Sequence, residues 1–475
     1  MKTYLEKNKE SIEALRKKIS ALFPEVSPKV YVETYGCQQN EADSEKLFGM
    51  SLDVGYVKTD NKNEADLILV NTCAVREHAE LKALSNTGQL KHIKEKNPNL
   101  IIGVCGCMVQ QEHRMGDIKN KYPYVDFVFG TNKIFDFPSI LLEVINSDKR
   151  KFFLESFETN RGDFCEEVPV ARSFPNKAWV SIMYGCNNFC SYCVVPYVRG
   201  RERSRSPEAI ISEINELLAS GCRDITLLGQ NVNSYGKDLV PSLSFVELLE
   251  KIEELPEDFV LRFMTSHPKD ATHELFDFIA KSRKLEHHFH LPLQSGSDRI
   301  LKEMNRNYTR EGFLNLCKYA KSVIPDISFT TDIIVGFPGE TEEDFLDTLS
   351  ALSEVKFDGV FSFVYSKRVG TRAAQMQNQI DEETKKERMS RLLELQQSIL
   401  FENNSKLNGN VFEVMVEGVS KHDDSVWAGR TRDGKLIHFP KENTPEFSLG
   451  DKTYVQVTDA QAYTVLGKYI NSEEK

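Results

Sequence analysis

Short hydrophobic runs recur along the first third of the chain. The segments KVYVETYG, ADLILVNT and NLIIGVCG are rich in β-branched residues, each ends in a turn of small residues, and a helical segment follows each one. Strands that alternate with helices indicate a parallel sheet covered by helices. We therefore predict an open parallel α/β sheet domain over residues 29–148, preceded by a polar helical extension at residues 1–28.

The alternation resumes after residues 149–176, which show no clear period and are predicted to be a linker. Six further strand candidates follow, separated by helical segments. Six units are two short of a full (β/α)8 barrel, so residues 177–404 are predicted to form a partial (β/α)6 barrel that is open on one side. The six segments are KAWVSIMYG, DITLLGQN, FVLRFMTS, EHHFHLPLQ, ISFTTDIIVGF and GVFSFVYS.

A third pattern occupies residues 405–471. Five short strands occur there at nearly regular spacing, which is typical of a small antiparallel β-barrel of OB-like size. The segments are VFEVMVEGV, SVWAGR, LIHFP, TYVQVTD and TVLGKYI. The chain as a whole is thus predicted to be an α/β protein with three folded domains.

The composition is that of an ordinary globular protein, with 40% hydrophobic and 28% charged residues among 475. The charged N-terminus lacks the apolar core of a secretory signal, and no later run approaches the ~20 apolar residues that span a bilayer. We expect a cytoplasmic monomer without a membrane partner. The net charge of −11 argues against a surface that binds nucleic acid throughout, although a local basic patch is compatible with it.

Ten cysteines in a cytosolic chain are better interpreted as metal ligands or reactive thiols than as disulfides. Cys186, Cys190 and Cys193 lie within eight residues, in CNNFCSYC, after the first strand of the predicted barrel. Three thiolates leave one position of a soft metal centre open, whereas sites that only hold structure normally use four ligands. The spacing alone also allows a zinc knuckle completed by a distant His, or a redox pair in CSYC.

The segment CNNFCSYC matches the CxxxCxxC motif of the radical S-adenosylmethionine (SAM) enzymes, with Tyr192 at the aromatic position. This resemblance implies a radical SAM barrel and a 4Fe-4S cluster whose open iron binds SAM. The segments YGCQQNEADSE, VNTCAVRE and CGCMVQ resemble the N-terminal domain of the radical SAM methylthiotransferase family. In that family three cysteines, here Cys37, Cys73 and Cys107, hold a second 4Fe-4S cluster with an open iron.

The other cysteines lack such companions. Cys105 ends the apolar run LIIGV, and we interpret it as a buried strand thiol rather than as a ligand. Cys165, Cys222 and Cys317 are interpreted in the same way, as small hydrophobic residues.

The resemblance extends from about residue 29 to residue 468, and GCQQN fits the branch of the family that modifies isopentenyladenosine in tRNA. It implies that a sulfur atom and a methyl group are inserted at C2 of N6-isopentenyladenosine next to the anticodon. Two SAM molecules would be used, one for methylation and one for a 5′-deoxyadenosyl radical that removes the C2 hydrogen. The same resemblance implies an electron-donor protein and an unidentified sulfur donor as partners.

Polar and small residues at the strand ends of the barrel are candidates for the SAM pocket. The resemblance places a SAM-binding element at Gly229 and Gln230, while Ser266 and Gln294 end the next strands and Gly336 would let the backbone approach adenine. Each of them is also compatible with an ordinary turn or capping role.

Arginines follow the cysteine loop at every second position, at Arg199, Arg201, Arg203 and Arg205. In an extended segment they would share one face, which suits phosphate oxygens of RNA, although such a run can also be a solvated loop. The C-terminal domain resembles the RNA-binding TRAM domain, and Arg430 and Arg432 in GRTRDGK are its best phosphate candidates. For Trp427 and Phe439 core packing is the favoured role over base stacking.

Two other functions are compatible with the sequence. The same two clusters could serve a methylthiotransferase for N6-threonylcarbamoyladenosine in tRNA or for an aspartate of a ribosomal protein. A different class is a protein without catalytic activity that binds zinc and RNA through its cysteines and its basic loop.

Overall fold

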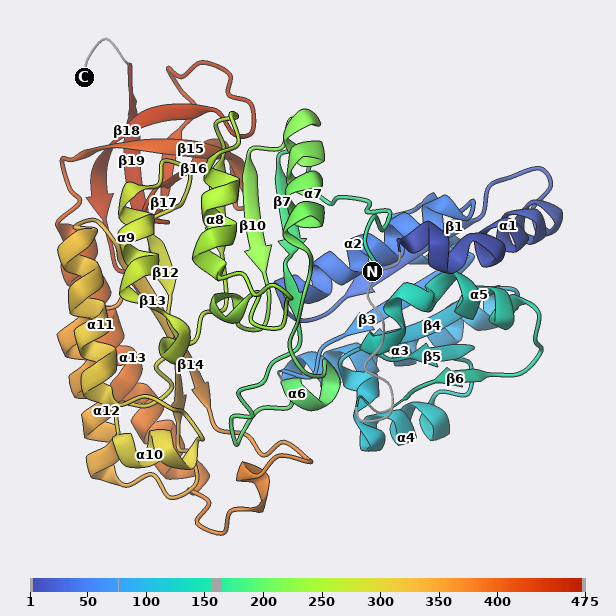
Figure 1. Ribbon diagram of the computed structural model, residues 1–475, viewed down its shortest axis with the longest axis horizontal. Coiled ribbons are helices and arrows are strands. Elements are labelled where there is room, and N and C mark those ends of the chain that lie inside the picture. Colours follow the sequence, from blue (N-terminus) through green and yellow to red (C-terminus); the bar gives the residue numbers. More distant parts are fainter. Residues whose placement is uncertain (1–2, 76, 156, 158–164, 472–475) are drawn as a thin grey trace.

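The computed structural model describes residues 3–75, 77–155, 157 and 165–471. Within them the N-terminal domain forms a six-stranded parallel sheet of order β2-β1-β3-β4-β5-β6 (Figure 1). The central strand β3 is buried along its whole length, as its uninterrupted LILVNT run requires. The strands are β1 (Lys29–Thr34), β2 (Val57–Lys58), β3 (Leu67–Thr72), β4 (Ile101–Gly106), β5 (Phe127–Phe129) and β6 (Lys151–Phe153).

Helices cover this sheet, and the N-terminal extension packs on one of them. Helix α1 begins at the capping box of Thr3 and Glu6 and buries one apolar side in the core of the N-terminal domain. Asn8 donates from Nδ2 to the Phe135 carbonyl at 3.0 Å and holds the helix there. The helices are α1 (Tyr4–Leu22), α2 (Gln38–Asp53), α3 (Glu77–Lys96), α4 (Glu112–Lys121) and α5 (Phe137–Ile145), with 3-10 turns η1 (Lys62–Glu64), η2 (Met108–Gln110) and η3 (Thr131–Asp136).

The prediction that residues 149–176 form only a linker is wrong for their first part. Strand β6 pairs in parallel with β5 and completes the edge of the sheet. Farther along, the backbone N–H of Ala171 donates to the Glu45 carbonyl of α2 at 3.0 Å, so this part of the segment lies against the N-terminal domain. Residues 156 and 158–164 are outside the described residues.

The partial barrel is confirmed. It consists of two three-stranded parallel sheets, β11-β10-β7 and β12-β13-β14, joined by a parallel bridge between Leu261 and Leu285. The small ribbon β8–β9 lies beside it. The strands are β7 (Lys177–Ser181), β8 (Met183–Tyr184), β9 (Arg203–Ser204), β10 (Asp224–Leu228), β11 (Val260–Phe263), β12 (His288–His290), β13 (Ser328–Val335) and β14 (Gly359–Val364).

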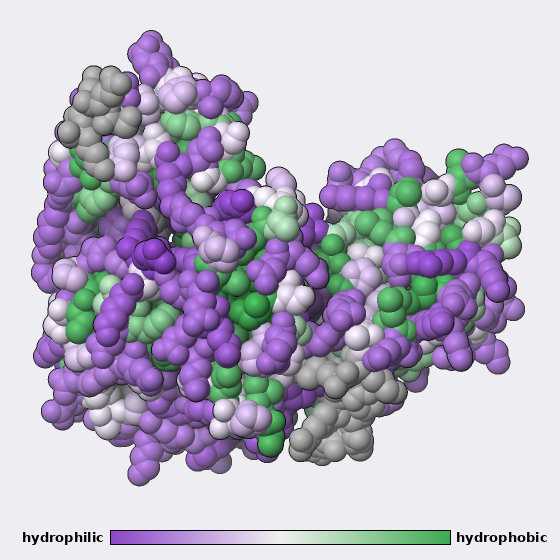
Figure 2. All heavy atoms as spheres, turned by 45° about the horizontal axis from the view of Figure 1, so that its top comes forward, coloured by the Kyte–Doolittle hydropathy of each residue, from purple (hydrophilic) through white to green (hydrophobic). Residues whose placement is uncertain are grey.

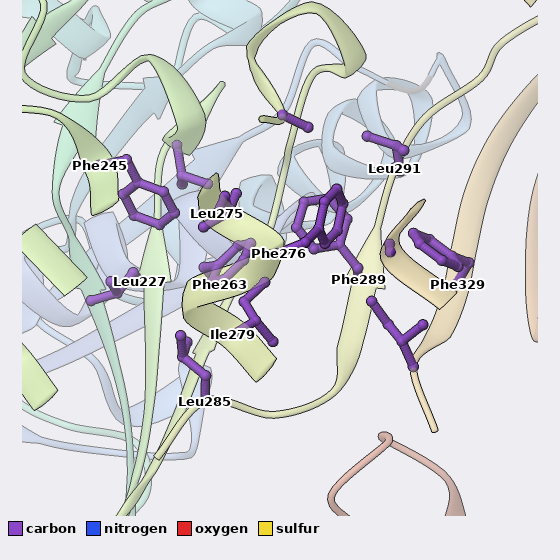
Figure 3. Close-up of a cluster of buried hydrophobic side chains, with 14 of the residues drawn as sticks. Leu227, Phe245, Phe263, Leu275, Phe276, Ile279, Leu285, Phe289, Leu291 and Phe329 are labelled. Carbon is purple, nitrogen blue, oxygen red and sulfur yellow. The ribbon is translucent and has the colours of Figure 1, made fainter. Parts of the chain in front are cut away.

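Most helices of this region pack outside these strands (Figure 1). They are α7 (Pro207–Ala219), α8 (Phe245–Glu253), α9 (His273–Lys281), α10 (Asp298–Glu303), α11 (Arg310–Val323), α12 (Glu342–Val355) and α13 (Glu382–Ser405), with η4 (Val232–Ser234), η5 (Pro268–Asp270) and η6 (Ala373–Gln375). The short helix α6 (Val195–Val198) lies instead beside the N-terminal domain. Aromatic rings fill the space between strands and helices. Phe276 of α9 lies 4.9 Å from Phe289 of β12, and Phe263 lies 5.5 Å from Phe289, between ring centroids (Figure 3).

The C-terminal domain is a closed five-stranded barrel of order β15-β16-β17-β19-β18. Its neighbours are antiparallel, as predicted, except that β17 and β19 run parallel. Trp427 and Phe439 are buried in its core, the role that the sequence favoured. The strands are β15 (Val411–Ser420), β16 (Asp423–Thr431), β17 (Leu436–Pro440), β18 (Lys452–Ala460) and β19 (Val465–Ile470).

Arg432 of GRTRDGK joins two domains, so its predicted role as an RNA ligand is wrong. It donates to the carbonyls of Ser282 and Leu285, which precede β12 in the partial barrel. These carbonyls need donors where the two domains meet, and the guanidinium of Arg432 is used there. Arg430 pairs with Glu417 of its own domain at 2.6 Å, and its role as an RNA ligand stays a prediction. Of the described residues, none belongs to a helix long and apolar enough to cross a membrane.

We expect Phe276→Ala to lower the free energy of unfolding by about 3–5 kcal/mol, because the ring is fully buried and its removal leaves a cavity. Urea denaturation followed by circular dichroism measures this change. Leu346→Ala is the control, since Leu346 lies on α12 with 46% of its surface exposed, and it should cost less than about 0.5 kcal/mol. Equal losses in both variants would contradict the packing described here.

Candidate active site between two cysteine triads

The first triad, Cys186, Cys190 and Cys193, lies on the loop between β8 and α6. Gly185 starts this loop with φ +80°, and a Cβ there would come within 2.1 Å of the Arg201 carbonyl, so glycine is required. The backbone N–H of Gly185 donates to Oε1 of Gln230, and that of Cys186 donates to the Gly200 carbonyl at 3.0 Å. The loop is therefore held from both sides.

Donors point at the sulfur atoms of this loop. The guanidinium of Arg306 places Nη1 3.6 Å from Sγ of Cys190, and the backbone N–H of Val195 donates to Sγ of Cys193 at 3.4 Å. Burial raises the pKa of Cys186 to about 11 and that of Cys193 to about 12. The thiols of these two residues are thus protonated near neutral pH, and binding of a metal would release their protons.

The second triad, Cys37, Cys73 and Cys107, lies at the carboxyl ends of three neighbouring strands, β1, β3 and β4. The turn at Gly36, with φ +124°, brings two of these thiols together, because a Cβ there would lie 2.7 Å from Sγ of Cys73. A hydrogen bond from Cys73 lowers the pKa of Cys37 to about 6, with a further contribution from Arg199, whereas burial raises that of Cys107 to about 11.

Arg199 reaches this second triad from the partial barrel. Its Nη2 donates to Oδ1 of Asn40 and pairs with Oδ2 of Asp43, each at 2.9 Å, and the residue is only 6% exposed. The prediction that Arg199 binds RNA phosphate is therefore wrong, because acids and amides of α2 already use the guanidinium.

The prediction that Arg205 binds RNA phosphate is wrong as well. Arg205 is buried, and it pairs with Glu166 of the segment before β7 at 2.6 Å and with Glu213 of α7 at 2.6 Å. Arg172 extends this network, since it pairs with Glu213 and, at 3.2 Å, with Glu45 of α2. By contrast, Arg201 is exposed, with its guanidinium 4.2 Å from the ring centroid of Phe189.

Arg203 is half-buried in the short strand β9. It therefore does not share one open face with all its neighbours in the run. Of the four predicted phosphate ligands, Arg201 keeps a solvent-exposed guanidinium, Arg203 stays a prediction, and the other two serve the domain interface.

One cavity of about 490 Å³ lies where the N-terminal domain meets the barrel, beside Cys193 of the first triad. Ala74 and Val75, which follow Cys73, line one wall, while Cys193 and Gln294 of the barrel line the other. Most of its lining area is apolar, and the charged side chains of Glu77, Asp332 and Arg368 also line it. The surface in Figure 2 is largely hydrophilic, and a recess there separates the lobe of the N-terminal domain from the rest of the molecule.

Cys107 also packs directly against the first loop. It forms one buried cluster with Ala74, Val194 and Val198. Since Val194 is the residue after Cys193, the two triads are neighbours across the interface between the domains.

The predicted SAM residues lie at successive strand ends of the barrel, as expected from their sequence positions. Gln294 adopts φ +68°, and its backbone bonds to β13 through Asp332 and Ile334. The reason given for Gly336 is corrected: a Cβ there would meet Cγ of Lys385 at 2.4 Å, so the close approach is to α13. Gly229 is buried and Gln230 holds the cysteine loop.

Several buried polar atoms of this region suit a cofactor. Oγ of Ser266, the predicted SAM residue, is buried without a hydrogen-bond partner, and so are Oγ of Ser191 and Oδ1 of Asn231. Buried polar atoms are normally paired, so unpaired ones at strand ends indicate a ligand position. The residues present therefore fit a polar cofactor such as SAM beside the first triad.

No group of three His, Cys, Asp or Glu side chains within the described ranges is placed to hold a single metal ion. In a 4Fe-4S cluster each thiolate binds a different iron, so its cysteine ligands stand farther apart than the ligands around one ion. Two sets of three cysteines thus fit cluster binding by their chemistry.

Sequence reasoning missed Asn40, Asp43 and Arg306. Asn40 belongs to the GCQQN segment and could have been noticed there, whereas Arg306 contacts Cys190 across 116 positions and gave no local signal. The interpretation of Cys105, Cys165, Cys222 and Cys317 is confirmed, since all four are buried in the hydrophobic cores.

Comparison with known proteins agrees with this arrangement. Residues 180–352 match the radical SAM superfamily, residues 29–130 match the uncharacterized protein family UPF0004, and residues 405–470 match the TRAM domain. The solved radical S-adenosylmethionine methyltransferase TsrM of Kitasatospora setae shares the fold, with TM-scores of 0.53 and 0.54 in two structures at 14% and 15% identity. The matched parts cover 71% and 74% of this chain and 73% and 77% of TsrM. These matches define a radical SAM protein.

Relatives with the name tRNA-2-methylthio-N(6)-dimethylallyladenosine synthase are far more similar. Those of Thermoanaerobacter pseudethanolicus and Clostridium botulinum are 50% and 49% identical over 93% of this chain, which covers 92% and 96% of their lengths. The relative of Clostridioides difficile is 48% identical over 93% of this chain and 92% of its own length. The chain belongs to the family of these synthases, which use SAM and 4Fe-4S clusters.

We expect Cys37 to react first when iron-free, reduced protein is treated with iodoacetamide. Because the thiolate is the reactive form and the pKa of Cys37 is about 6, its alkylation rate should rise through pH 6 and level off above about pH 7. Mass spectrometry of peptides measures the rate. Cys73→Ala removes the donor and should move this midpoint upward, whereas a wild-type midpoint near the ordinary ~8.5 would contradict the contact.

Proposed function

We propose that this protein adds a methylthio group at C2 of N6-isopentenyladenosine beside the anticodon of tRNA. The observation that carries the proposal is about 50% identity, over 93% of the chain, to synthases named for this nucleoside. The matches span all three domains. The large apolar part of the cavity beside Cys193 is also compatible with an isopentenyl group.

In this proposal Cys186, Cys190 and Cys193 hold one 4Fe-4S cluster, and Cys37, Cys73 and Cys107 hold the other. When bound, the clusters and two SAM molecules supply the electron, the radical, the sulfur and the methyl group. The chain itself positions the reactants around one cavity and keeps water away from them. The apolar packing of Cys107 on Val194 supports a short separation between the two sites.

The cofactor-binding residues are assigned on the same basis. Ser266 and Gln294 would hold the polar parts of SAM, and Tyr192 lines the cavity beside Cys193. Gln230 acts on SAM indirectly, because it fixes the loop through Gly185. Gly229 and Gly336 are proposed as backbone neighbours of the cofactor.

Contacts with the anticodon loop are assigned to Arg201, with Arg203 beside it. Arg201 is exposed on the loop after the first triad, so its charge can meet a phosphate near the reacting base. Unpaired bases of a loop can be turned outward at modest cost, so the C2 edge can enter the cavity.

Further partners follow from the chemistry. An electron-donor protein must reduce the cluster at Cys186–Cys193, and a sulfur donor must replace the sulfur that each product removes. We propose that the protein works in the cytoplasm as a monomer, where tRNA and such donors are present.

We expect Cys190→Ala to abolish SAM cleavage and Cys73→Ala to keep it measurable while stopping sulfur insertion. Release of 5′-deoxyadenosine and formation of the methylthio nucleoside, both followed by mass spectrometry, separate the two activities. Cys105→Ala is the matched control, since this buried thiol lies two residues from Cys107 and should retain both. Equal loss of both activities in Cys73→Ala, with the first cluster intact, would refute the division.

We also expect tRNA from a strain that lacks this protein to accumulate isopentenyladenosine without its methylthio group, and the gene on a plasmid to restore it. Nucleoside mass spectrometry gives the answer directly. Unchanged methylthio-isopentenyladenosine, with loss of the threonylcarbamoyl product or of a modified ribosomal aspartate, would favour the rival methylthiotransferases. Colourless, zinc-containing protein after anaerobic purification would favour the rival without catalysis, because two clusters require about eight irons.

A further inference from the structure

Arg199 belongs to the partial barrel, but its guanidinium binds residues of the N-terminal domain. It directly follows helix α6, which comes after the loop that carries Cys186, Cys190 and Cys193, yet its guanidinium lies among residues of α2 in the N-terminal domain. Both of these hydrogen-bond partners, Asn40 and Asp43, are themselves buried, Asn40 fully and Asp43 to 96%. A buried charge in such a place requires compensation from its neighbours.

Asn40 links this guanidinium to the thiols. Its Oδ1, which accepts from Arg199, lies 3.7 Å from Sγ of Cys37 and 3.9 Å from Sγ of Cys107. Its Nδ2 donates to the carbonyls of Tyr35 and Thr72, at 3.0 and 2.9 Å. These carbonyls belong to the turns that lead into Cys37 and Cys73, so one amide connects all three strand ends of the triad.

A cluster held at this triad explains why a cation is needed. Three thiolates outweigh the positive charge of a 4Fe-4S core, so the bound group would carry a net negative charge, and Asp43 is buried in the same region. A guanidinium stays protonated in proteins and can donate to two partners at once. Removal of Arg199 would leave the carboxylate of Asp43 buried beside the thiolates without its cation. Loss of one partner of a buried ion pair is strongly destabilising, because the other charge stays uncompensated.

We propose that Arg199 is a positioning residue for the N-terminal triad, and that it ties this triad to the loop of the first triad. The inference rests on the proposed cluster ligands, Cys37, Cys73 and Cys107. From the barrel side, Arg199 fixes Asn40 and thereby the turns that present the thiols. Its positive charge also favours the reduced, more negative state of a cluster bound there, so it raises the reduction potential of that cluster.

The test uses the full-length protein, purified and reconstituted without oxygen. Arg199→Gln removes the charge, and Arg199→Lys keeps it on a shorter side chain without the Nη2 that reaches both Asn40 and Asp43. Arg262→Gln is the matched control, because Arg262 is 8% exposed and pairs with Asp224 and Glu286 inside the barrel. The readouts are iron per chain, the potential of each cluster from a redox titration followed by electron paramagnetic resonance, and SAM cleavage. Addition of SAM identifies the signal of the first cluster.

We expect Arg199→Gln to lose up to about half of the iron, the four irons of one cluster, or to keep them at a lower potential. SAM cleavage should persist, Arg199→Lys should be intermediate, and Arg262→Gln should resemble wild type. Wild-type iron content and potentials in Arg199→Gln would overturn the proposal. So would equal damage to both clusters in Arg199→Gln and Arg262→Gln, since that result reflects packing alone.

The readouts also separate this inference from the proposed function. If wild-type protein made no methylthio nucleoside but Arg199→Gln still lost only the second cluster, the positioning role would stand while the proposed reaction would fall.

Discussion

The contact between helix α2 and the partial barrel determines how the N-terminal domain and its cysteines are oriented relative to the barrel. Arg199, Arg205 and Arg172 cross or border this interface and pair with acids on α2, on α7 and on the segment before β7. Buried ion pairs of this kind contribute little net stability compared with apolar packing, but separating the two domains would leave uncompensated buried charges. In the resulting orientation Cys107 of one triad packs against Val194, the residue after Cys193 of the other.

The fold could be predicted largely from the chain because parallel strands have strong local signals. Long β-branched runs identified β1, β3 and β4 and the six barrel strands, and the ends of parallel strands meet at one edge. This rule also predicted that Cys37, Cys73 and Cys107 converge. Strands β5 and β6 were missed, since three residues are too few to show a period. The parallel pairing of β17 with β19 depends on barrel closure, which strand spacing does not reveal.

The arginines show where prediction from local sequence fails. Alternate arginines share a face only in an extended chain, and here Arg199 directly follows a helix while Arg205 begins a buried network. Asp43 lies 156 positions from Arg199 and Glu166 lies 39 positions from Arg205, so no short window of sequence contains these pairs, although Glu213 lies only 8 positions from Arg205. The same reason explains Arg432, whose acceptors are 147 and 150 positions distant. A run of charged residues indicates where charge is needed, but the tertiary fold determines which groups these residues pair with.

The position of the C-terminal barrel limits the size of any ligand that contacts both this barrel and the cysteine loops. Arg432 anchors that barrel beside the beginning of β12, whereas the cysteine loops lie at the opposite, carboxyl ends of the strands (Figure 1). Strand β13 has eight residues, which corresponds to a height of about 26 Å at ~3.3 Å per residue. A free nucleoside is far too short to bridge this height, and a folded stem with its loop is long enough. Only a macromolecular ligand could therefore contact the C-terminal barrel and the cysteine loops at the same time.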